Sequence, residues 1–291
     1  MPNKYAAMDN WSEEEVALFK ELAIAQSEGE PNITAGPMAT ASSTQSHLKI
    51  VAEGDSWFDY KISADLIDCL RKFHGYKIKN YAKLGDTLEN MIYGTQVDRD
   101  YNRSTPQINI VLRRVEQVQP DVFLFSGGGN DIAGNEFPSF LHHSEANLGV
   151  LKTDFAESTI NVTFRKYYLD LIQKVLAKSP NTHIFTHGYG YARPTGKGVG
   201  ILGIDFVGPW LLPSLGMKGI DNNEGKKAIE TLINLYNDML KELDAENPNF
   251  HHIDLRHLLS DDDWRDELHL KSSAYRLASD SIAASISSVY T

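Results

Sequence analysis

The sequence is short of cysteine and of basic residues, and it contains no apolar run of transmembrane length. Its single cysteine, Cys69, excludes an intramolecular disulfide, and the amphipathic stretch around it predicts a small buried side chain rather than a nucleophile. The 28 Lys and Arg residues against 39 Asp and Glu give a formal net charge of −11. That charge argues against nucleic acid and anionic membrane surfaces as partners.

The first residues contain no apolar core of a signal peptide. We therefore expect a cytoplasmic protein without stable membrane insertion. Residues 11–28 have the apolar spacing of a short helix, and residues 29–46 are rich in Gly, Pro, Ser, Thr and Ala. The chain is thus predicted to consist of an N-terminal helix and flexible linker, residues 1–46, followed by one compact domain, residues 47–291.

Several common site motifs are missing. No Gly-x-Ser-x-Gly turn occurs, which argues against a standard α/β-hydrolase. The glycines from Gly190 to Gly198 have neither the spacing nor the Ser or Thr after lysine that a phosphate-binding loop needs. His251 and Asp254 would point to opposite faces of a strand, which argues against a metal that both side chains bind. We therefore predict no metal and no cofactor.

Strand-like and helix-like segments alternate from residue 48 onward. Amphipathic stretches at helical spacing are clearest over 226–244 and 273–289. This alternation predicts a three-layer α/β/α sandwich with a central, mostly parallel five-stranded sheet, whose site lies at the carboxyl ends of the strands. The predicted strands are residues 48–53, 76–81, 121–126, 182–187 and 250–254.

A serine stands where the first predicted strand ends and a helix-like stretch begins, in Gly54-Asp55-Ser56. Gly54 is expected to permit the tight turn. Parallel α/β folds expose reactive groups at such a turn, and the backbone N–H groups that follow point toward developing negative charge. This position predicts that Ser56 is a nucleophile. The alternative is that Ser56 or Asp55 merely caps a helix. That alternative is preferred unless other motifs support a nucleophile.

Three further motifs supply that support. Ala82-Lys83-Leu84-Gly85-Asp86-Thr87-Leu88 follows the second predicted strand, Ser126-Gly127-Gly128-Gly129-Asn130-Asp131 follows the third, and Trp264-Arg265-Asp266-Glu267-Leu268-His269 precedes the last helix. Together with the serine, the motifs resemble the SGNH hydrolases, also called the GDSL esterase/lipase family. That family is named for four residues, which match Ser56, Gly85, Asn130 and His269. The resemblance runs from about residue 48 to the C-terminus and implies a flavodoxin-like fold.

The resemblance also implies a catalytic role for each of these residues. Ser56 would attack an ester carbonyl, His269 would take its proton, and Asp266 would hold the imidazole tautomer. The oxyanion donors would be the backbone N–H groups of Ser56 and Gly85 and the side-chain amide of Asn130. Each motif alone could be a cap, a turn or a solvated pair, but their joint occurrence in the family's order favours the catalytic interpretation. Asp55 and Asp131 are expected to hold their loops through backbone hydrogen bonds.

Three aromatic residues are candidates for substrate contact. Trp57 follows the serine, where the family's name has leucine; His187 ends the fourth predicted strand; and Trp210 lies in the long, glycine-rich segment 192–224. That segment and 132–158 are too long for plain connections and are candidates for a substrate-shaping rim. The alternative for His187 is a structural role, and for Trp210 it is an anchor of the loop in the core.

The sequence therefore predicts a serine esterase that acts through an acyl-enzyme. Its substrate would be a small-molecule carboxylic ester, with an acetylated sugar, a lipid and a thioester all open. An acyltransferase of the same fold is the alternative within enzymes, because its first half-reaction is identical. A binding protein with a silent site is the alternative outside them. The oligomeric state stays open.

Overall fold

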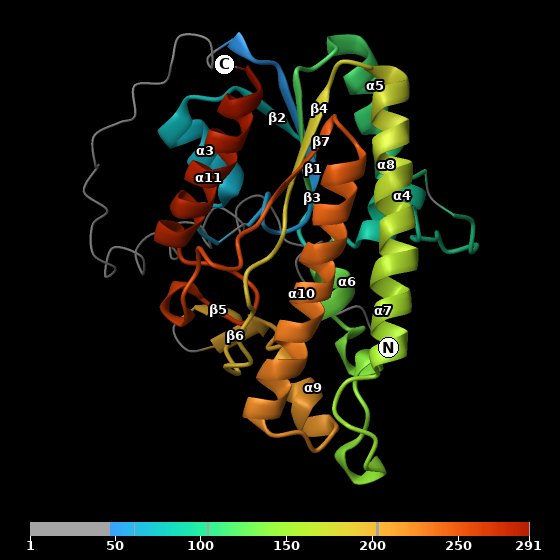
Figure 1. Cartoon of the computed structure of the whole chain (residues 1–291), viewed down its shortest axis with the longest axis vertical. Coiled ribbons are helices and arrows are strands. Elements are labelled where there is room, and N and C mark those ends of the chain that lie inside the picture. The colour runs from blue at the N-terminus through green and yellow to red at the C-terminus, as the bar shows by residue number, and fades with distance from the viewer. Residues whose placement is uncertain (1–46, 61, 104, 202–203, 291) are drawn as a thin grey trace.

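The computed structural model describes residues 47–60, 62–103, 105–201 and 204–290 (Figure 1). The predictions for residues 1–46 lie outside this part of the chain. Its main sheet has five strands in the order β2-β1-β3-β4-β7, and every neighbouring pair is parallel. All five predicted strands are confirmed. Their bounds are β1 Ile50–Gly54, β2 Ile78–Asn80, β3 Val122–Ser126, β4 His183–His187 and β7 Phe250–Ile253.

The central strands are buried along their whole length. Every residue of β1 and of β3 is buried, including the polar Glu53 and Ser126. Such continuous burial is typical of a parallel strand that has helices on both sides. β1 pairs residue by residue with β3, so that Gly54 lies beside Ser126 at the carboxyl ends of both strands.

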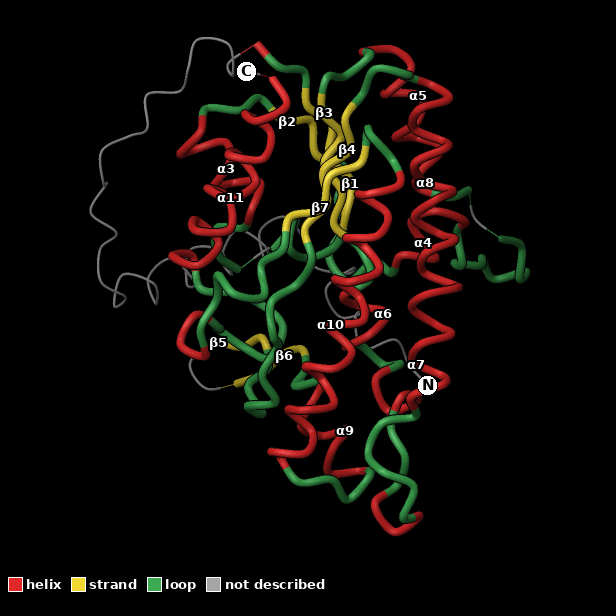
Figure 2. Tube along the Cα trace, in the orientation of Figure 1, coloured by secondary structure: helices red, strands yellow, loops and turns green. Residues whose placement is uncertain are grey.

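Helices cover both faces of the sheet and give the predicted three layers (Figures 1 and 2). One face carries α3, Leu66–His74, and α11, Ser272–Tyr290, which pack against each other. The other face carries α4 Leu88–Tyr93, α5 Gln107–Val118, α8 Arg165–Lys178 and α10 Asn222–Glu246.

The longest helix, α10, begins where Asp221 accepts hydrogen bonds from the N–H groups of Asn223 and Glu224. It begins before the predicted range because this cap lies ahead of the first apolar residue of the stripe, and it also ends slightly later than predicted. The residues that the sequence placed on its apolar face are all buried: Ile229, Leu232, Ile233, Tyr236, Leu240 and Leu243. α11 likewise covers the predicted 273–289.

The two long segments contain structure of their own at the carboxyl end of the sheet (Figure 1). The first begins at the end of α6, Gly129–Ala133, and holds η2 Phe137–Phe140, η3 Ser144–Ala146 and α7 Thr153–Ser158. α7 continues through the π-helix η4, Thr159–Phe164, into α8. The second holds an antiparallel hairpin of β5 Val199–Ile201 and β6 Ile204–Val207, followed by α9 Leu211–Met217. The short helix η5 is Asp261–Asp263.

The prediction for the single cysteine is confirmed. Cys69 is 2% exposed, and burial raises the pKa of its thiol to about 12, so the cysteine is the buried apolar residue that was predicted. No helix in the described ranges is both long and apolar enough to cross a bilayer.

Candidate active site

The site lies where the order of the strands reverses. The chain moves from β1 outward to β2 and then returns to the other side of β1 with β3. Open parallel sheets bind their ligands at the crevice outside such a switch point. Ser56 follows β1 and Asn130 follows β3, so the fold brings two of the four family residues to this crevice.

Gly54 is required at this point for space. A Cβ on Gly54 would lie 2.8 Å from both the Cβ and the carbonyl oxygen of Ser126, which is closer than real contacts permit. Gly54 is not among the glycines with positive φ. A turn follows Gly54 directly, as expected, but glycine is required here because it lets β1 approach β3 closely just before the serine.

Ser56, His269 and Asp266 form one chain of hydrogen bonds. His269 Nε2 lies 2.8 Å from Ser56 Oγ, and His269 Nδ1 lies 3.0 Å from each carboxylate oxygen of Asp266. All three side chains are buried. In this geometry the imidazole can take the hydroxyl proton while the carboxylate fixes which ring nitrogen carries hydrogen.

The turn from Asp266 to His269 holds its own carboxylate. Asp266 Oδ1 accepts hydrogen bonds from the backbone N–H groups of Leu268 and His269, both at 2.8 Å. Burial acts to raise the pKa of Asp266, but the adjacent His269 and these N–H donors outweigh it, and the pKa lies below its usual value. Asp266 is therefore ionised at neutral pH.

Tyr60 belongs to the same cluster, although no sequence motif marks it. Its hydroxyl donates to Asp266 Oδ2 at 3.0 Å, and its ring stacks on the imidazole of His269 with centroids 4.2 Å apart. Burial, followed by the charge of Asp266, raises the pKa of Tyr60 far above its usual value. The hydroxyl thus stays protonated and remains a donor.

Three N–H donors lie on the loops around the serine. The Asn130 amide donates to the carbonyl oxygen of Asp86 at 2.9 Å, which uses one of its two hydrogens. The backbone N–H groups of Ser56 and Gly85 donate to no other described residue. Gly85 has a φ of 76°, the left-handed region that favours glycine. Of the three residues, Ser56 and Asn130 both line the pocket beside the serine.

The two neighbouring aspartates hold these loops, as predicted. Asp55 Oδ1 accepts from the backbone N–H of Trp57 at 3.0 Å. Asp131 Oδ2 accepts from the backbone N–H of Leu88 at 2.8 Å and so ties α6 to the loop that carries Gly85.

A buried polar network lies directly beneath the serine. Asp55 also accepts from Ser126 Oγ at 2.7 Å and from the hydroxyl of Tyr189, while His187 Nε2 lies 2.9 Å from Ser126 Oγ. Burial lowers the pKa of His187 to about 3, so its ring is neutral. His187 is 1% exposed and stacks behind Trp57 with centroids 4.9 Å apart. The structure thus places it under the pocket wall rather than on the pocket surface.

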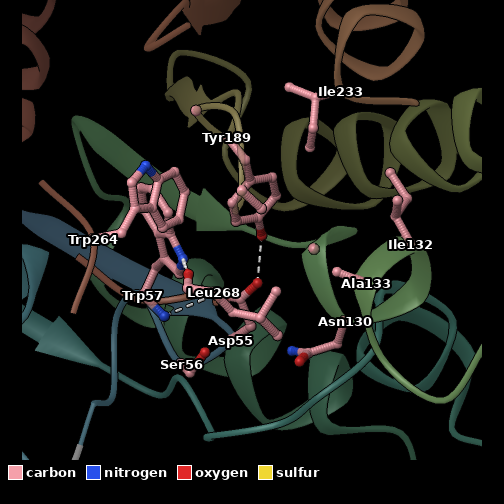
Figure 3. A pocket seen from close by; sticks show the side chains of 13 residues that line it. Asp55, Ser56, Trp57, Asn130, Ile132, Ala133, Tyr189, Ile233, Trp264 and Leu268 are labelled. Carbon is pink, nitrogen blue, oxygen red and sulfur yellow. Dashed lines mark hydrogen bonds between the residues drawn. The ribbon is translucent and has the colours of Figure 1, made fainter. Parts of the chain in front are cut away.

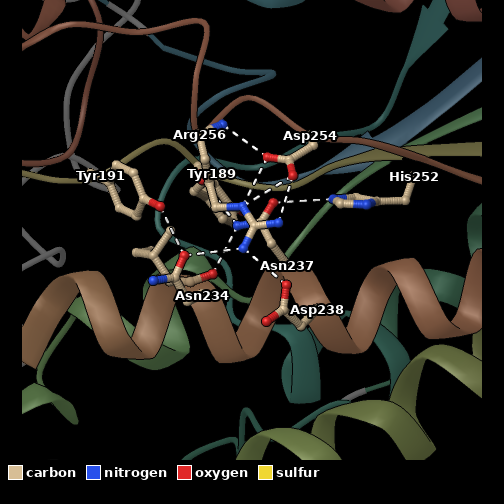
Figure 4. Close-up of polar contacts among 9 residues, drawn as sticks. Tyr189, Tyr191, Asn234, Asn237, Asp238, His252, Asp254 and Arg256 are labelled. Carbon is tan, nitrogen blue, oxygen red and sulfur yellow. Dashed lines mark hydrogen bonds and ion pairs between the residues drawn. The ribbon is translucent and has the colours of Figure 1, made fainter.

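The loop that carries Tyr189 is braced from α10 (Figure 4). Asn237 donates to the carbonyl oxygen of Tyr189 at 3.2 Å, and its own oxygen lies 3.1 Å from His252 Nε2. Arg256 joins the same part of α10 to the loop after β7 through Asn234, Asp238 and Asp254. This network connects the exits of β4 and β7.

An apolar pocket opens beside the serine (Figure 3). Trp57 and Trp264 stand on one side, and Ile132 and Ala133 of α6 stand on the other. Its further lining residues are Asp55, Ser56, Gly129, Asn130, Tyr189, Gly190, Ala192, Ile233 and Leu268. Leu268 lines the pocket, whereas the neighbouring His269 does not.

Trp210 lies on the imidazole side instead. Its ring meets His269 edge-on, with centroids 5.8 Å apart and an interplanar angle of 68°, and it does not line the pocket. Of the three predicted substrate-contacting residues, the structure therefore places Trp57 in the pocket wall, His187 behind it and Trp210 beside the histidine. In the described ranges, no three His, Cys, Asp or Glu residues are grouped so that they could hold a metal ion.

A model of the GDSL-like Lipase/Acylhydrolase family matches residues 52–277, and the chain belongs to this family of ester-bond hydrolases. The chain is similar in structure to the lipase Lip_vut3 from a goat rumen metagenome, at 16% identity over 81% of this chain and 96% of that one, with a TM-score of 0.52. At that identity the likeness shows the shared fold alone. No curated protein sequence matches the chain.

Two further solved structures are similar with lower TM-scores. Phospholipase A1 from Streptomyces albidoflavus is 13% identical over 82% of this chain and 98% of that one, with a TM-score of 0.49. A Clostridium thermocellum family 3 carbohydrate esterase is 14% identical over 83% and 98%, with a TM-score of 0.46.

Proposed function

We propose that the chain hydrolyses a neutral carboxylic ester through a covalent acyl-enzyme on Ser56. The hydrogen-bonded chain from Asp266 through His269 to Ser56, at the mouth of an apolar pocket, carries this proposal. The Ser56 oxygen attacks the ester carbonyl carbon as its proton passes to His269 Nε2. The carbon–oxygen bond to the alcohol then breaks, and His269 returns the proton to the leaving oxygen. Water repeats the sequence and frees the acid.

The carbonyl oxygen becomes negatively charged in each tetrahedral intermediate. The backbone N–H groups of Ser56 and Gly85 and the free amide hydrogen of Asn130 are proposed to stabilise that charge. Preorganised donors of this kind act mainly in the transition state, because the charge is small in the bound ester.

The pocket suggests how the ester is oriented. Its walls include Ser56 and Asn130 but not His269. The leaving oxygen must lie beside His269 Nε2 to receive a proton, so the alcohol portion points toward the imidazole. The apolar pocket is then left for the acyl group, and its Trp, Ile and Ala walls favour an uncharged one. Acetyl esters and lipid esters both meet this requirement.

A labelling experiment with a turnover assay tests the proposal. A fluorophosphonate probe should label the wild-type protein and not Ser56→Ala. The wild type should hydrolyse p-nitrophenyl esters of graded acyl length, and Ser56→Ala, folded by circular dichroism, should not. Unlabelled wild type without esterase activity would contradict the proposal and favour a silent site. Transfer to an added alcohol that outpaces transfer to water would instead make the chain an acyltransferase.

A further inference from the structure

Glu267 is a completely buried acid in the middle of the turn that carries Asp266 and His269. In the described part of the chain it forms no salt bridge, and its carboxylate accepts hydrogen bonds from backbone N–H groups. The four donors are Gly196 at 3.0 Å, Trp210 at 2.5 Å, Leu211 at 2.6 Å and Leu212 at 3.0 Å. A buried carboxylate with four such donors is a strong point of attachment, because each bond is charge-assisted.

All four donors belong to the segment that the sequence identified as a possible rim. Three of them are successive N–H groups at the start of α9, where no side-chain cap from Trp210 is formed. Glu267 therefore supplies, from a distant part of the chain, the acceptor that the first turn of α9 needs. A fifth link runs in the opposite direction, since the N–H of Glu267 donates to the carbonyl oxygen of Lys197 at 3.2 Å.

This attachment sets the position of Trp210. The N–H of Trp210 is bound by Glu267, two residues before His269, and the indole ring meets the imidazole edge-on. Tyr60 stacks on the same imidazole. The ring of His269 is thus in contact with two aromatic side chains, one from the serine loop and one from the segment that Glu267 holds.

We propose that Glu267 is a positioning residue that keeps Trp210 against His269 and thereby aligns the imidazole to protonate the departing alcohol. The proposal rests on the serine esterase mechanism given above. It concerns one step, the transfer of the proton from His269 Nε2 to the leaving oxygen as the carbon–oxygen bond breaks. It assigns to Glu267 no contact with the substrate.

Aryl acetates of similar size and different leaving-group basicity isolate that step. A p-nitrophenolate leaves with little help from a proton, whereas a p-methoxyphenolate, which is more basic, depends on it more. The value of kcat/KM reports the steps up to acylation, so it includes this proton transfer and excludes hydrolysis of the acyl-enzyme. A misaligned imidazole should slow the p-methoxyphenyl ester more than the p-nitrophenyl ester.

The test variant is Glu267→Gln. The amide keeps the size of the side chain but offers one acceptor oxygen and turns an NH₂ group toward N–H donors. We expect the ratio of kcat/KM for p-nitrophenyl over p-methoxyphenyl acetate to rise by about fivefold or more, on the scale of a partial loss of general acid catalysis. Trp210→Ala should raise the ratio in the same direction, and it gives the answer independently if Glu267→Gln does not fold.

Asp221→Asn is the matched control, since Asp221 caps α10 in the same way but outside the site. Its ratio should equal that of the wild type. An unchanged ratio in folded Glu267→Gln, or in Trp210→Ala, would overturn the proposal. So would an equal rise in Asp221→Asn, because the effect would then follow from lost stability. If the wild type labels with fluorophosphonate and the variants keep its kcat/KM ratio, this proposal is refuted and the serine mechanism remains intact.

Discussion

The phenol ring of Tyr60 lies flat against the imidazole of His269, with centroids 4.2 Å apart and an interplanar angle of 24°. The same phenol donates a hydrogen bond to Asp266, whose carboxylate is also hydrogen-bonded to Nδ1 of the imidazole. One side chain thus contacts both the proposed base and the acid that orients it. Tyr60 comes from the loop after the serine, so it also connects the two halves of the site.

We predict that Tyr60→Phe lowers kcat for a p-nitrophenyl ester by about tenfold, the effect of losing one charge-assisted hydrogen bond. The ring and its stacking on His269 remain, so the melting temperature should change little. Tyr93→Phe is the control, because Tyr93 also donates to a carboxylate, that of Asp170, but from α4. Equal activity in Tyr60→Phe and wild type would show that Asp266 does not need the Tyr60 hydroxyl in addition to its donors from Leu268 and His269.

The serine and the histidine should act as a unit. We predict that Ser56→Ala and His269→Ala each reduce kcat by about 10⁴-fold or more, and that the double variant is little worse than either. The reason is that the hydroxyl is inert without a base and the base has no nucleophile to activate. Steady-state kinetics on a short p-nitrophenyl ester measure this. Losses that multiply in the double variant would mean that the two residues act in separate steps.

Asn130→Ala should lower kcat by about 10²–10³-fold while KM changes little, because the amide is proposed to bind charge that develops only in the transition state. Asn90→Ala is a useful comparison, since Asn90 also donates to Asp86 but to its carboxylate. It should retain most of the activity. A change confined to KM in Asn130→Ala would reassign the amide to binding the ester in its ground state.

Because the carboxyl group of Glu53 is buried, we predict that the free energy of unfolding depends on pH. Glu53 is fully buried beside the serine loop, and burial, followed by the charge of Asp86, raises the pKa of Glu53 to about 9. The folded protein therefore keeps this proton at pH values where the unfolded chain, with an ordinary glutamate pKa near 4.5, has lost it. Stability contributed by this group is complete below about pH 4.5 and falls as the pH rises, by up to about 1.4 kcal/mol per unit.

Glu53→Gln, which cannot ionise, should remove that slope. In urea unfolding at pH 6, 7 and 8, the free energy of unfolding of the variant should increase relative to that of the wild type as the pH rises. Activity provides the control for an intact site, because Glu53 lies beneath the serine loop and takes no part in the proposed chemistry. Parallel stability profiles for the two proteins would show that Glu53 is already ionised when folded.

Much of the fold can be predicted from the sequence because local patterns of residue types indicate its strands and helices. The β-branched and aromatic runs mark the five strands, and the apolar spacing of 226–244 marks α10. In a parallel sheet all carboxyl ends meet at one edge, so motifs that follow strands must converge there. That rule brings Ser56, Gly85 and Asn130 together without any knowledge of contacts, and Asp266 lies three residues from His269 on one turn.

Other features leave no local signal, and only the tertiary structure decides them. Tyr60 and Asp266 are 206 residues apart, and the Glu267 carboxylate reaches back to Gly196 and to the start of α9. Packing likewise puts His187 behind Trp57 and makes Gly54 a matter of space beside Ser126. The sequence alone determined which residues reach the site edge of the sheet, because strand ends and motif order are local properties. The partners that hold and orient those residues come from distant segments, and only the packing of the whole chain selects them.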